Sequence, residues 1–173
     1  MILVFRYVTT WWRARRQPPL GPLDESVLPL IVLPNDLDIN LHLNNGRYLS
    51  LMDLGRVDLM TRCGLTTHII QQRWMPLVGA ATMRYTRSLA LFQRYTLHTR
   101  IVGWDDKWFF VEQRFMRDGQ LIASGRVRGL LRGRNGNIKT RTILEALGHD
   151  PVSPPLPENI DAWQRSLERD SSG

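Results

Sequence analysis

The sequence of 173 residues is poor in cysteine, in lysine and in long apolar runs. Its single cysteine, Cys63, excludes an internal disulfide framework and any metal site that needs two thiolate ligands. One free thiol also fits a reducing compartment, so we expect a cytoplasmic protein. No uncharged apolar run reaches about 18 residues, which excludes a conventional membrane-spanning helix. A chain of this length most simply forms one domain with its own core.

Lysine is almost absent, although the chain is basic. Only Lys107 and Lys139 are lysines among 23 basic residues, and the net charge is +7. This balance suits anionic partners such as phosphates, nucleic acid or an acidic membrane surface. Arginine offers a planar fork that binds phosphate through two hydrogen bonds. The charge alone does not decide among these partners.

The N-terminal segment is unusually apolar. Residues 1–12 read MILVFRYVTTWW, and three arginines follow within residues 13–16. The run is too short to span a bilayer, but tryptophans beside arginines suit contact of residues 1–16 with a membrane surface, which would make the protein peripheral to the membrane. The alternative is a strand or helix that docks on the body of the fold or on a partner subunit. Prolines and a glycine in residues 17–22 indicate a linker, so residues 1–22 form a separate segment.

The rest of the chain predicts one long helix followed by strands. Apolar spacing of three and four residues indicates a mostly buried helix over residues 44–63, with Asn44 or Asn45 as its cap and Gly64 as its end. Asp118–Gly119 is a strong hairpin signal. We expect an α+β domain over residues 23–148 in which a curved antiparallel sheet of about five strands wraps the helix. The expected strands are 26–33, 74–87, 95–104, 107–117 and 120–132, with a short helix at 139–147 and a proline-rich, charged tail at 149–173, in which we expect a helical turn or two.

A single sheet with one helix leaves two unpaired edge strands. Such edges are usually covered or paired with another chain. We therefore expect a homodimer or a homotetramer.

Polar groups concentrate between residues 35 and 48, just before the predicted helix. The stretch reads NDLDINLHLNNGRY and contains two carboxylates, an imidazole and several amides. The N–H groups of the first helical turn lack partners within the helix, so this end can polarise a carbonyl while a carboxylate supplies a nucleophile or general base. Asparagine and aspartate are also common turn formers and caps, so the residue types alone leave both interpretations open.

The pattern D-x-D-x-x-x-H-x-N-N-x-x-Y-L from Asp36 to Leu49 resembles the signature of hot-dog proteins of the 4-hydroxybenzoyl-CoA thioesterase type. L-x-x-x-D-L-G-R, from Leu49 to Arg56, resembles the helix of that family. The similarity extends over roughly residues 28–134 and is marked for the subgroup called thioesterase superfamily member six, which shares the L-P-x-D-L-D start, L-R-G-R and L-E-A-L-G.

The resemblance implies an acyl-CoA thioesterase with a hot-dog fold and no cofactor or metal. In this family the second aspartate of D-x-D, here Asp38, attacks the thioester carbonyl or activates water. The backbone N–H near Asn45 would polarise the thioester oxygen. His42, Asn44 and Tyr48 would order the loop or contact the acyl-CoA substrate, whereas Asp36 would be structural. The alternative is a catalytically weak hot-dog protein that binds acyl chains or lipid at a membrane surface.

Three further features have open interpretations. Leu41 stands where many family members have glycine, and we expect its bulk to narrow the pocket. Arg126, Arg128 and Arg132 share one face of a predicted strand and could meet the phosphates of CoA, stack with aromatics on single-stranded nucleic acid, or simply be solvated. Because no nucleic-acid-binding signature accompanies them, we do not expect nucleic acid as a partner. Cys63 is interpreted as a small core residue rather than a nucleophile.

Overall fold

The computed structural model describes residues 2–170; Met1 and the last three residues of the predicted tail lie outside the described residues. The chain forms helices and strands, and the strands after the first follow one another directly in the sequence. In chain order they are α1 (Ile2–Ala14), β1 (Ser26–Ile31), the 3-10 helix η1 (Pro34–Asp36), α2 (Asn45–Arg62), α3 (Leu65–Gln72), β2 (Met75–Tyr85), β3 (Arg94–Trp104), β4 (Phe109–Arg117), β5 (Gln120–Gly133), β6 (Gly136–Asn137), α4 (Thr140–Ala146) and α5 (Glu158–Asp170).

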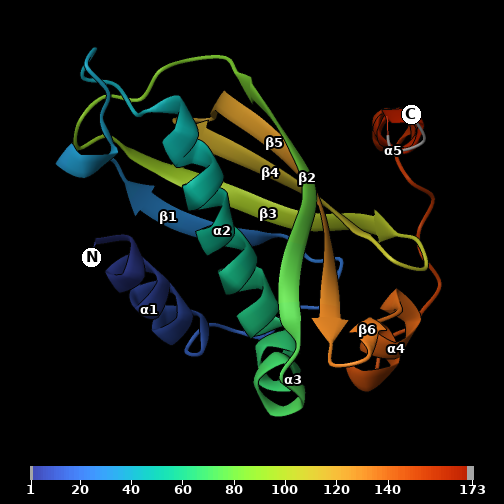
Figure 1. Cartoon of the computed structure of the whole chain (residues 1–173). Helices are drawn as coiled ribbons and strands as arrows, with labels where there is room; N and C mark the ends of the chain where they lie inside the picture. Colours follow the sequence, from blue (N-terminus) through green and yellow to red (C-terminus); the bar gives the residue numbers. More distant parts are fainter. Residues whose placement is uncertain (1, 171–173) are drawn as a thin grey trace.

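The strands form one antiparallel sheet in the order β1-β3-β4-β5-β2, and the short β6 extends it by pairing with β5. The sheet curls around α2, which lies across its concave face (Figure 1). Asp118 and Gly119 have φ angles of 50° and 73°, and they join β4 to β5 in the tight turn that the sequence predicts. The expected α+β hot-dog arrangement is confirmed, with β6 as an addition.

The helix α2 begins and ends at local signals. The side chain of Asn44 accepts a hydrogen bond of 2.8 Å from the N–H of Gly46, which satisfies one of the free donors of the first turn. Gly64, with a φ of 81°, ends the helix in the left-handed region. Gly55 faces the sheet so closely that a Cβ there would collide with Thr99 and Leu97. Glycine at this position therefore lets the helix lie directly on the sheet.

A buried polar link also joins α2 to the sheet. The side chain of Gln113 is fully buried, and its Nε2 donates to the carbonyl of Met52 and to Thr99 Oγ1, each at 2.9 Å. Its Oε1 accepts a hydrogen bond of 2.8 Å from Arg56. Because a buried amide is costly without partners, these contacts specify one position of α2 on β3 and β4.

The N-terminal segment forms a helix that docks on the body. Helix α1 lies beside α2 and below β1 (Figure 1). Arg6 donates a hydrogen bond of 2.8 Å to the carbonyl of Ile31 and forms an ion pair of 2.9 Å with Asp36. Thr10 and Ala14 are buried on the same side. Of the conformations left open by the sequence, the docked helix is the one that the structure adopts.

Two helices differ from the sequence-based expectation. The helix α3 is absent from it, because Gly64 indicates a stop and LTTHIIQQ is rich in β-branched residues. Its Leu65 and Ile69 pack with Leu131 and Ile143, so tertiary contacts override the weak local signal. The helix α5 spans 13 residues instead of one or two turns, and its Ile160 packs on Val102 and Phe110.

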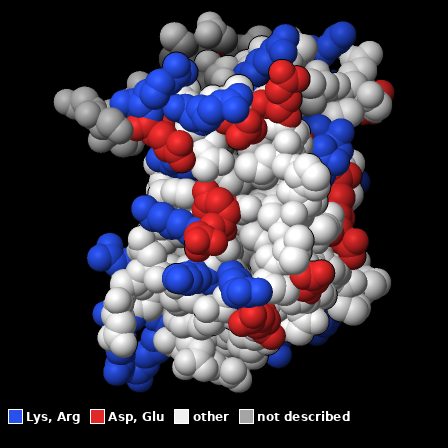
Figure 2. Space-filling view, turned by 90° about the vertical axis from the view of Figure 1, so that its right-hand side faces the viewer, with Lys and Arg blue, Asp and Glu red and all other residues white. Residues whose placement is uncertain are grey.

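Charge is unevenly distributed over the surface. On the side that carries α4 and α5, basic groups gather at the top and along the left-hand edge of the view, and a broad uncharged area lies to the right of the centre (Figure 2). Acidic groups stand between these areas.

Candidate active site

The loop between β1 and α2 holds Asp38 in a tight turn. Asp38 Oδ1 accepts hydrogen bonds from the N–H groups of Asn40 and His42, at 2.8 and 3.2 Å. The N–H of Asp38 donates to the carbonyl of His42 at 2.8 Å, and the N–H of Leu41 donates to the carbonyl of Asp38 at 3.1 Å. One carboxylate oxygen therefore orders the turn, and the side chain stays partly exposed at the rim of a pocket.

Asp36 has a different environment two residues earlier. Its side chain is only 1% exposed, and its Oδ2 accepts a hydrogen bond of 3.0 Å from the N–H of Leu33 beside the ion pair with Arg6. Arg47 contacts the other carboxylate oxygen of Asp36 at 3.4 Å. The backbone carbonyl of Asp36 accepts a hydrogen bond of 2.8 Å from the N–H of Asn44. Every one of these contacts holds the base of the loop. Asp36 thus has the partners of a structural residue.

Asp38 shares its pocket with the first turn of α2. The pocket has a volume of about 300 Å³, and Asp38, His42, Asn45 and Tyr48 lie in its wall. Asn44 is absent from the residues that line this pocket, since its side chain is committed to capping the helix through Gly46. A carboxylate beside a helix N-terminus can attack a carbonyl or activate water, while the N–H groups and helix dipole stabilise the developing oxyanion.

Two tyrosines line this pocket. Tyr48 is buried and meets the rings of Tyr85 and Phe115 edge to face, at centroid distances of 5.3 and 4.9 Å. Burial, together with the neighbouring Tyr85, raises the pKa of Tyr48 to about 12. Burial also raises the pKa of Tyr85, whose hydroxyl donates a hydrogen bond of 2.9 Å to the carbonyl of Asn45. Both phenols are therefore protonated at neutral pH, and Tyr85 positions the first residue of the helix.

Several pocket residues come from a part of the chain that the sequence does not connect with the site. Tyr85, Thr86, Arg87 and Ser88 lie at the end of β2 and in the turn after it, and they line the same pocket as Asp38. The His42–Ala90 bridge and the hydrogen bond from Leu43 to Leu89 hold this turn against the loop. The only signal in the sequence is a polar T-R-S directly after a strand. This tripeptide joins the pocket only because segments that are distant in sequence lie side by side in the fold.

Arg87 brings a positive charge to the pocket. A neighbouring open cavity of about 410 Å³ is lined by Arg87 and Ser88 on one side and by Arg117 and Asp118 on the other. Arg117 contacts Asp118 at 3.3 Å across an exposed surface, where such a pair contributes little. The two cavities share Arg87 and Ser88 in their linings, and Arg117 lines the second of them.

Leu41 does not narrow the pocket, contrary to the expectation from its bulk. It adopts a φ of 59°, in the left-handed region that glycine favours, and its side chain is 69% exposed. This conformation turns the side chain away from the pocket, whose lining does not include it. A positive φ at this position is a conformation that glycine adopts more easily than leucine.

The arginines on β5 lie away from the pocket. Arg126 pairs with Glu112 and Thr82 on the face of the sheet opposite α2, and the guanidinium of Arg128 lies 4.6 Å from the ring centroid of Trp108. Neither they nor Arg132 line the pocket that contains Asp38. They therefore give no support to a phosphate contact at this site.

Cys63 is not suited to nucleophilic chemistry. It packs in a core cluster with Leu65 and Leu131, and burial raises the pKa of its thiol. A protonated, buried thiol is a poor nucleophile. The interpretation of Cys63 as a core residue agrees with these contacts.

A second, more apolar cavity lies beneath the other half of α2. It has a volume of about 260 Å³, and aliphatic and aromatic side chains from α2, α3, β2, β3, β4 and β5 form most of its wall. Tyr7, Asp53 and Arg56 are the polar residues in its lining. Cavities of this composition bind apolar groups rather than water.

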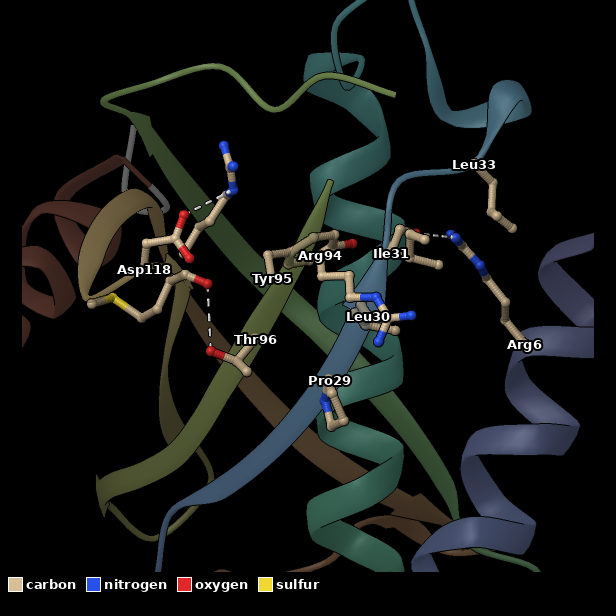
Figure 3. Close-up of a pocket in the computed structure, with 11 residues that line it drawn as sticks. Arg6, Pro29, Leu30, Ile31, Leu33, Arg94, Tyr95, Thr96 and Asp118 are labelled. Atoms are coloured by element: carbon tan, nitrogen blue, oxygen red, sulfur yellow. Dashed lines mark hydrogen bonds and ion pairs between the residues drawn. The ribbon is translucent and has the colours of Figure 1, made fainter. Parts of the chain in front are cut away.

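A third hollow lies where β1, β3 and β4 meet α1. It is open, has a volume of about 520 Å³, and contains Arg94 and Thr96 beside the point where Arg6 reaches the carbonyl of Ile31 (Figure 3). Its polar groups are mostly engaged: Arg6 with Asp36, Thr96 with the carbonyl of Met116 at 3.4 Å, and Asp118 with Arg117. Because these polar groups already have partners within the fold, the hollow between α1 and the sheet is less suited to catalysis than the pocket of Asp38.

Comparison with known proteins identifies the family of this fold. Residues 32–164 match the family model described as the thioesterase-like superfamily. Protein THEM6 of Danio rerio is 38% identical over 176 residues, which cover 97% of this chain and 85% of that protein.

Solved structures share the same architecture. A gentisyl-coenzyme A thioesterase has a TM-score of 0.64 at 21% identity and covers 70% of this chain and 98% of its own. A Staphylococcus aureus protein solved in complex with CoA has a TM-score of 0.64 at 13% identity, with 83% of this chain and 96% of that chain covered. At these identities the likeness concerns the fold.

Proposed function

Because the chain belongs to the thioesterase-like superfamily, and is thereby a thioester hydrolase, we propose that its substrates are acyl-CoA thioesters and that it releases a free acid and CoA. The observation that carries this proposal is the shared pocket of Asp38 and the first turn of α2. The hydrolytic class follows from the family, whereas the acyl-CoA substrate and the residue roles are proposed here.

In the proposed mechanism the thioester carbonyl lies between Asp38 and the start of α2. The N–H near Asn45 and the positive end of the helix polarise the carbonyl oxygen. Asp38 either attacks the carbonyl carbon, forming an anhydride that water then opens, or removes a proton from the attacking water. In both routes the carbon–sulfur bond breaks and the CoA thiolate leaves and is protonated.

The remaining pocket residues would bind and orient the substrate. His42 lies at the exposed rim, and Tyr48 closes the inner wall. Asn44 would act indirectly, by capping α2. The adjoining cavity offers Arg87 and Arg117, whose guanidinium groups suit the phosphates of CoA.

A second candidate function is binding of acyl chains or lipid by a catalytically weak protein at a membrane surface. The apolar cavity under α2, with Leu77, Ile101 and Phe109 in its wall, favours it, because such a cavity of about 260 Å³ can accept an alkyl chain. Hydrolysis and binding are distinguished by turnover, since a binding protein would retain the thioester intact.

We also propose that the protein is a homodimer or homotetramer in the cytoplasm, peripheral to a membrane through residues 1–16. The edge strand β2 supports self-association: it has 11 residues, no strand on its outer side in the described sheet, and exposed Met75 and Val78. Sedimentation that shows a monomer at micromolar concentration would contradict this assembly.

A panel of short-chain, long-chain and aromatic acyl-CoAs tests the proposed activity. Release of free CoA is measured with a thiol reagent, and the Asp38→Asn protein, purified in parallel, controls for contaminating hydrolases. We expect turnover with at least one class and near-background rates for the variant. Absence of turnover by the wild type on every class, combined with retained binding of a fluorescent fatty acid, would transfer the conclusion to the binding function.

A further inference from the structure

Helix α1 buries polar groups against the body and leaves large apolar side chains exposed on its other side. The face that docks on the body contains Arg6, Thr10 and Ala14, all buried. Val4, Val8 and Trp12 follow the same spacing but begin two residues earlier, so they lie about 200° away around the helix. A helix that docks on a core normally buries its apolar stripe. Here the docked side is held by the Arg6–Asp36 ion pair together with Tyr7, which packs on the core, while a second apolar side remains uncovered.

The uncovered side forms a continuous apolar stripe. Val4, Phe5, Val8 and Trp12 are 65%, 68%, 57% and 56% exposed. Large apolar side chains that are exposed together on one face indicate an interaction surface, whereas isolated ones need no explanation. The free stripe of α1 is therefore a surface that a partner is expected to cover.

Basic and aromatic groups at the end of α1 indicate the kind of partner. The guanidinium of Arg15 lies 4.8 Å from the ring centroid of Trp11, and that of Arg16 lies 3.1 Å from that of Trp12. Tryptophan paired with arginine suits the headgroup region of a bilayer, where the ring enters the apolar boundary and the cation meets phosphate. Residues 1–16 contain no acidic residue. Symmetric pairing of this face with the same face of a second copy would therefore bring positive charges together without any acidic partner from α1.

From these observations we propose that the free face of α1 (Val4, Phe5, Val8 and Trp12, with Arg15 and Arg16) binds flat on the surface of an anionic bilayer. The helix is about 20 Å long, shorter than the apolar thickness of a membrane. None of the helices between residues 2 and 170 is long and apolar enough to cross one. This inference rests on the proposed membrane contact of residues 1–16 and is independent of the hydrolytic activity.

Docking through α1 would orient the proposed active site as well. Arg6 on the buried side of α1 holds Asp36, at the base of the loop that carries Asp38, so helix and loop are linked directly. Ile39 and Leu41 are exposed at the tip of that loop, which rises above the N-terminal end of α1 (Figure 1). The substrate pocket would then lie close to the lipid surface.

Vesicle sedimentation tests the proposal with the full chain. The probes are vesicles of phosphatidylcholine alone and of phosphatidylcholine with phosphatidylglycerol. We expect the wild type to bind the anionic vesicles, and the double variant Phe5→Gln/Trp12→Gln to bind at least about tenfold more weakly, because two large apolar groups no longer leave water. The matched control is Ile70→Gln/Val152→Gln, which removes equally exposed apolar groups outside α1 and should bind like the wild type.

A further variant separates the basic from the apolar contribution. Arg15→Gln/Arg16→Gln should lose the preference for anionic over neutral vesicles, and added salt should reduce it in the wild type. All the substituted side chains are on the surface, so thermal melting should be unchanged. Wild-type protein that binds neither vesicle, or an α1 variant that binds like the wild type, would overturn the proposal. An α1 variant that changes only the oligomer size would overturn it in favour of a second copy on this face.

Discussion

Asp36 and Asp38 stand two residues apart in one loop, yet their surroundings are opposite. Asp36 is buried and in contact with two arginines, and its oxygens are engaged in the fold. Asp38 is half-buried at the rim of a pocket, and one of its oxygens orders a turn of backbone N–H groups. The difference teaches that one short polar loop can contain both its own anchor and a carboxylate that lines a pocket.

The largest expected effect sharpens this comparison at Asp38. Asp38→Asn keeps the shape of the side chain but removes the negative charge and the basic lone pair. Loss of a positioned general base lowers rates by about 10²–10⁴-fold, and loss of a nucleophile by more. The free energy of unfolding should change little, because the side chain is partly exposed and leaves no cavity. Steady-state hydrolysis and thermal melting on the same samples provide the check; activity within threefold of wild type would show that Asp38 is not the reactive carboxylate.

The next effect concerns the anchor. Arg6→Ala leaves the buried carboxylate of Asp36 with Arg47, at 3.4 Å, as its remaining ion-pair partner in the described structure. Removal of one partner from a buried pair typically costs about 3–5 kcal/mol, and we expect about 3 kcal/mol here since Arg47 remains. Urea denaturation measures it. The matched control is Arg141→Ala, which breaks an exposed pair with Glu145 and should change stability by less than about 0.5 kcal/mol. If Arg6→Ala and Arg141→Ala lowered the free energy of unfolding equally, the buried ion pair of Asp36 would contribute no more than an exposed one.

A smaller effect on stability is expected at Asn44, the residue that caps the start of α2. Asn44→Ala removes the cap on Gly46 and should lower the free energy of unfolding by about 1 kcal/mol. Asn44→Asp retains an acceptor oxygen and should preserve stability. Activity should fall modestly, because the first turn of α2 frays near Asn45. If Asn44→Ala and Asn44→Asp had the same melting temperature, the acceptor oxygen at this position would not be what stabilises the start of α2.

The smallest expected effect is a gain. Leu41 has a φ of 59°, a conformation that costs less for glycine than for leucine, so Leu41→Gly should stabilise the protein by about 0.5–1 kcal/mol. Its side chain points away from the pocket, so hydrolysis should be unchanged. Ile39→Gly, at a neighbouring exposed position without a positive φ, serves as the control and should not stabilise. Chemical denaturation of the wild type and the two variants measures the free energies of unfolding; a Leu41→Gly protein no more stable than the wild type would contradict the prediction.

The fold was predictable where local chemistry determines it. The cap at Asn44, the glycine after the helix and the Asp118–Gly119 turn each act through nearest neighbours, and the structure confirms all three. Helix α3 could not be predicted in this way, because its β-branched residues have weak helix propensity and its apolar side chains pack against residues distant in sequence, such as Leu131 and Ile143.

The candidate site was predictable in part for the same reason. The residues of the loop and of the first turn of α2 are contiguous in sequence, and the resemblance to the family identifies them. Arg87 and Tyr85 join them only because β2 is the edge strand beside β5, and Arg6 meets Asp36 across 30 positions of chain. Such pairings between distant segments depend on the assembled fold, which periodicity and composition do not describe.

The contact of Gly55 with the sheet has a consequence for motion. Since Gly55 has no side chain of its own, α2 packs closely against the side chains of Leu97 and Thr99, and its backbone accepts a hydrogen bond from Gln113, so the helix and the sheet should move as one rigid body. Opening that admits a substrate must then come from the loops around Asp38 and Arg87. In hydrogen exchange, we expect amides in the middle of α2 to open only with global unfolding, and amides of residues 37–43 to exchange through local fluctuations of far lower free energy.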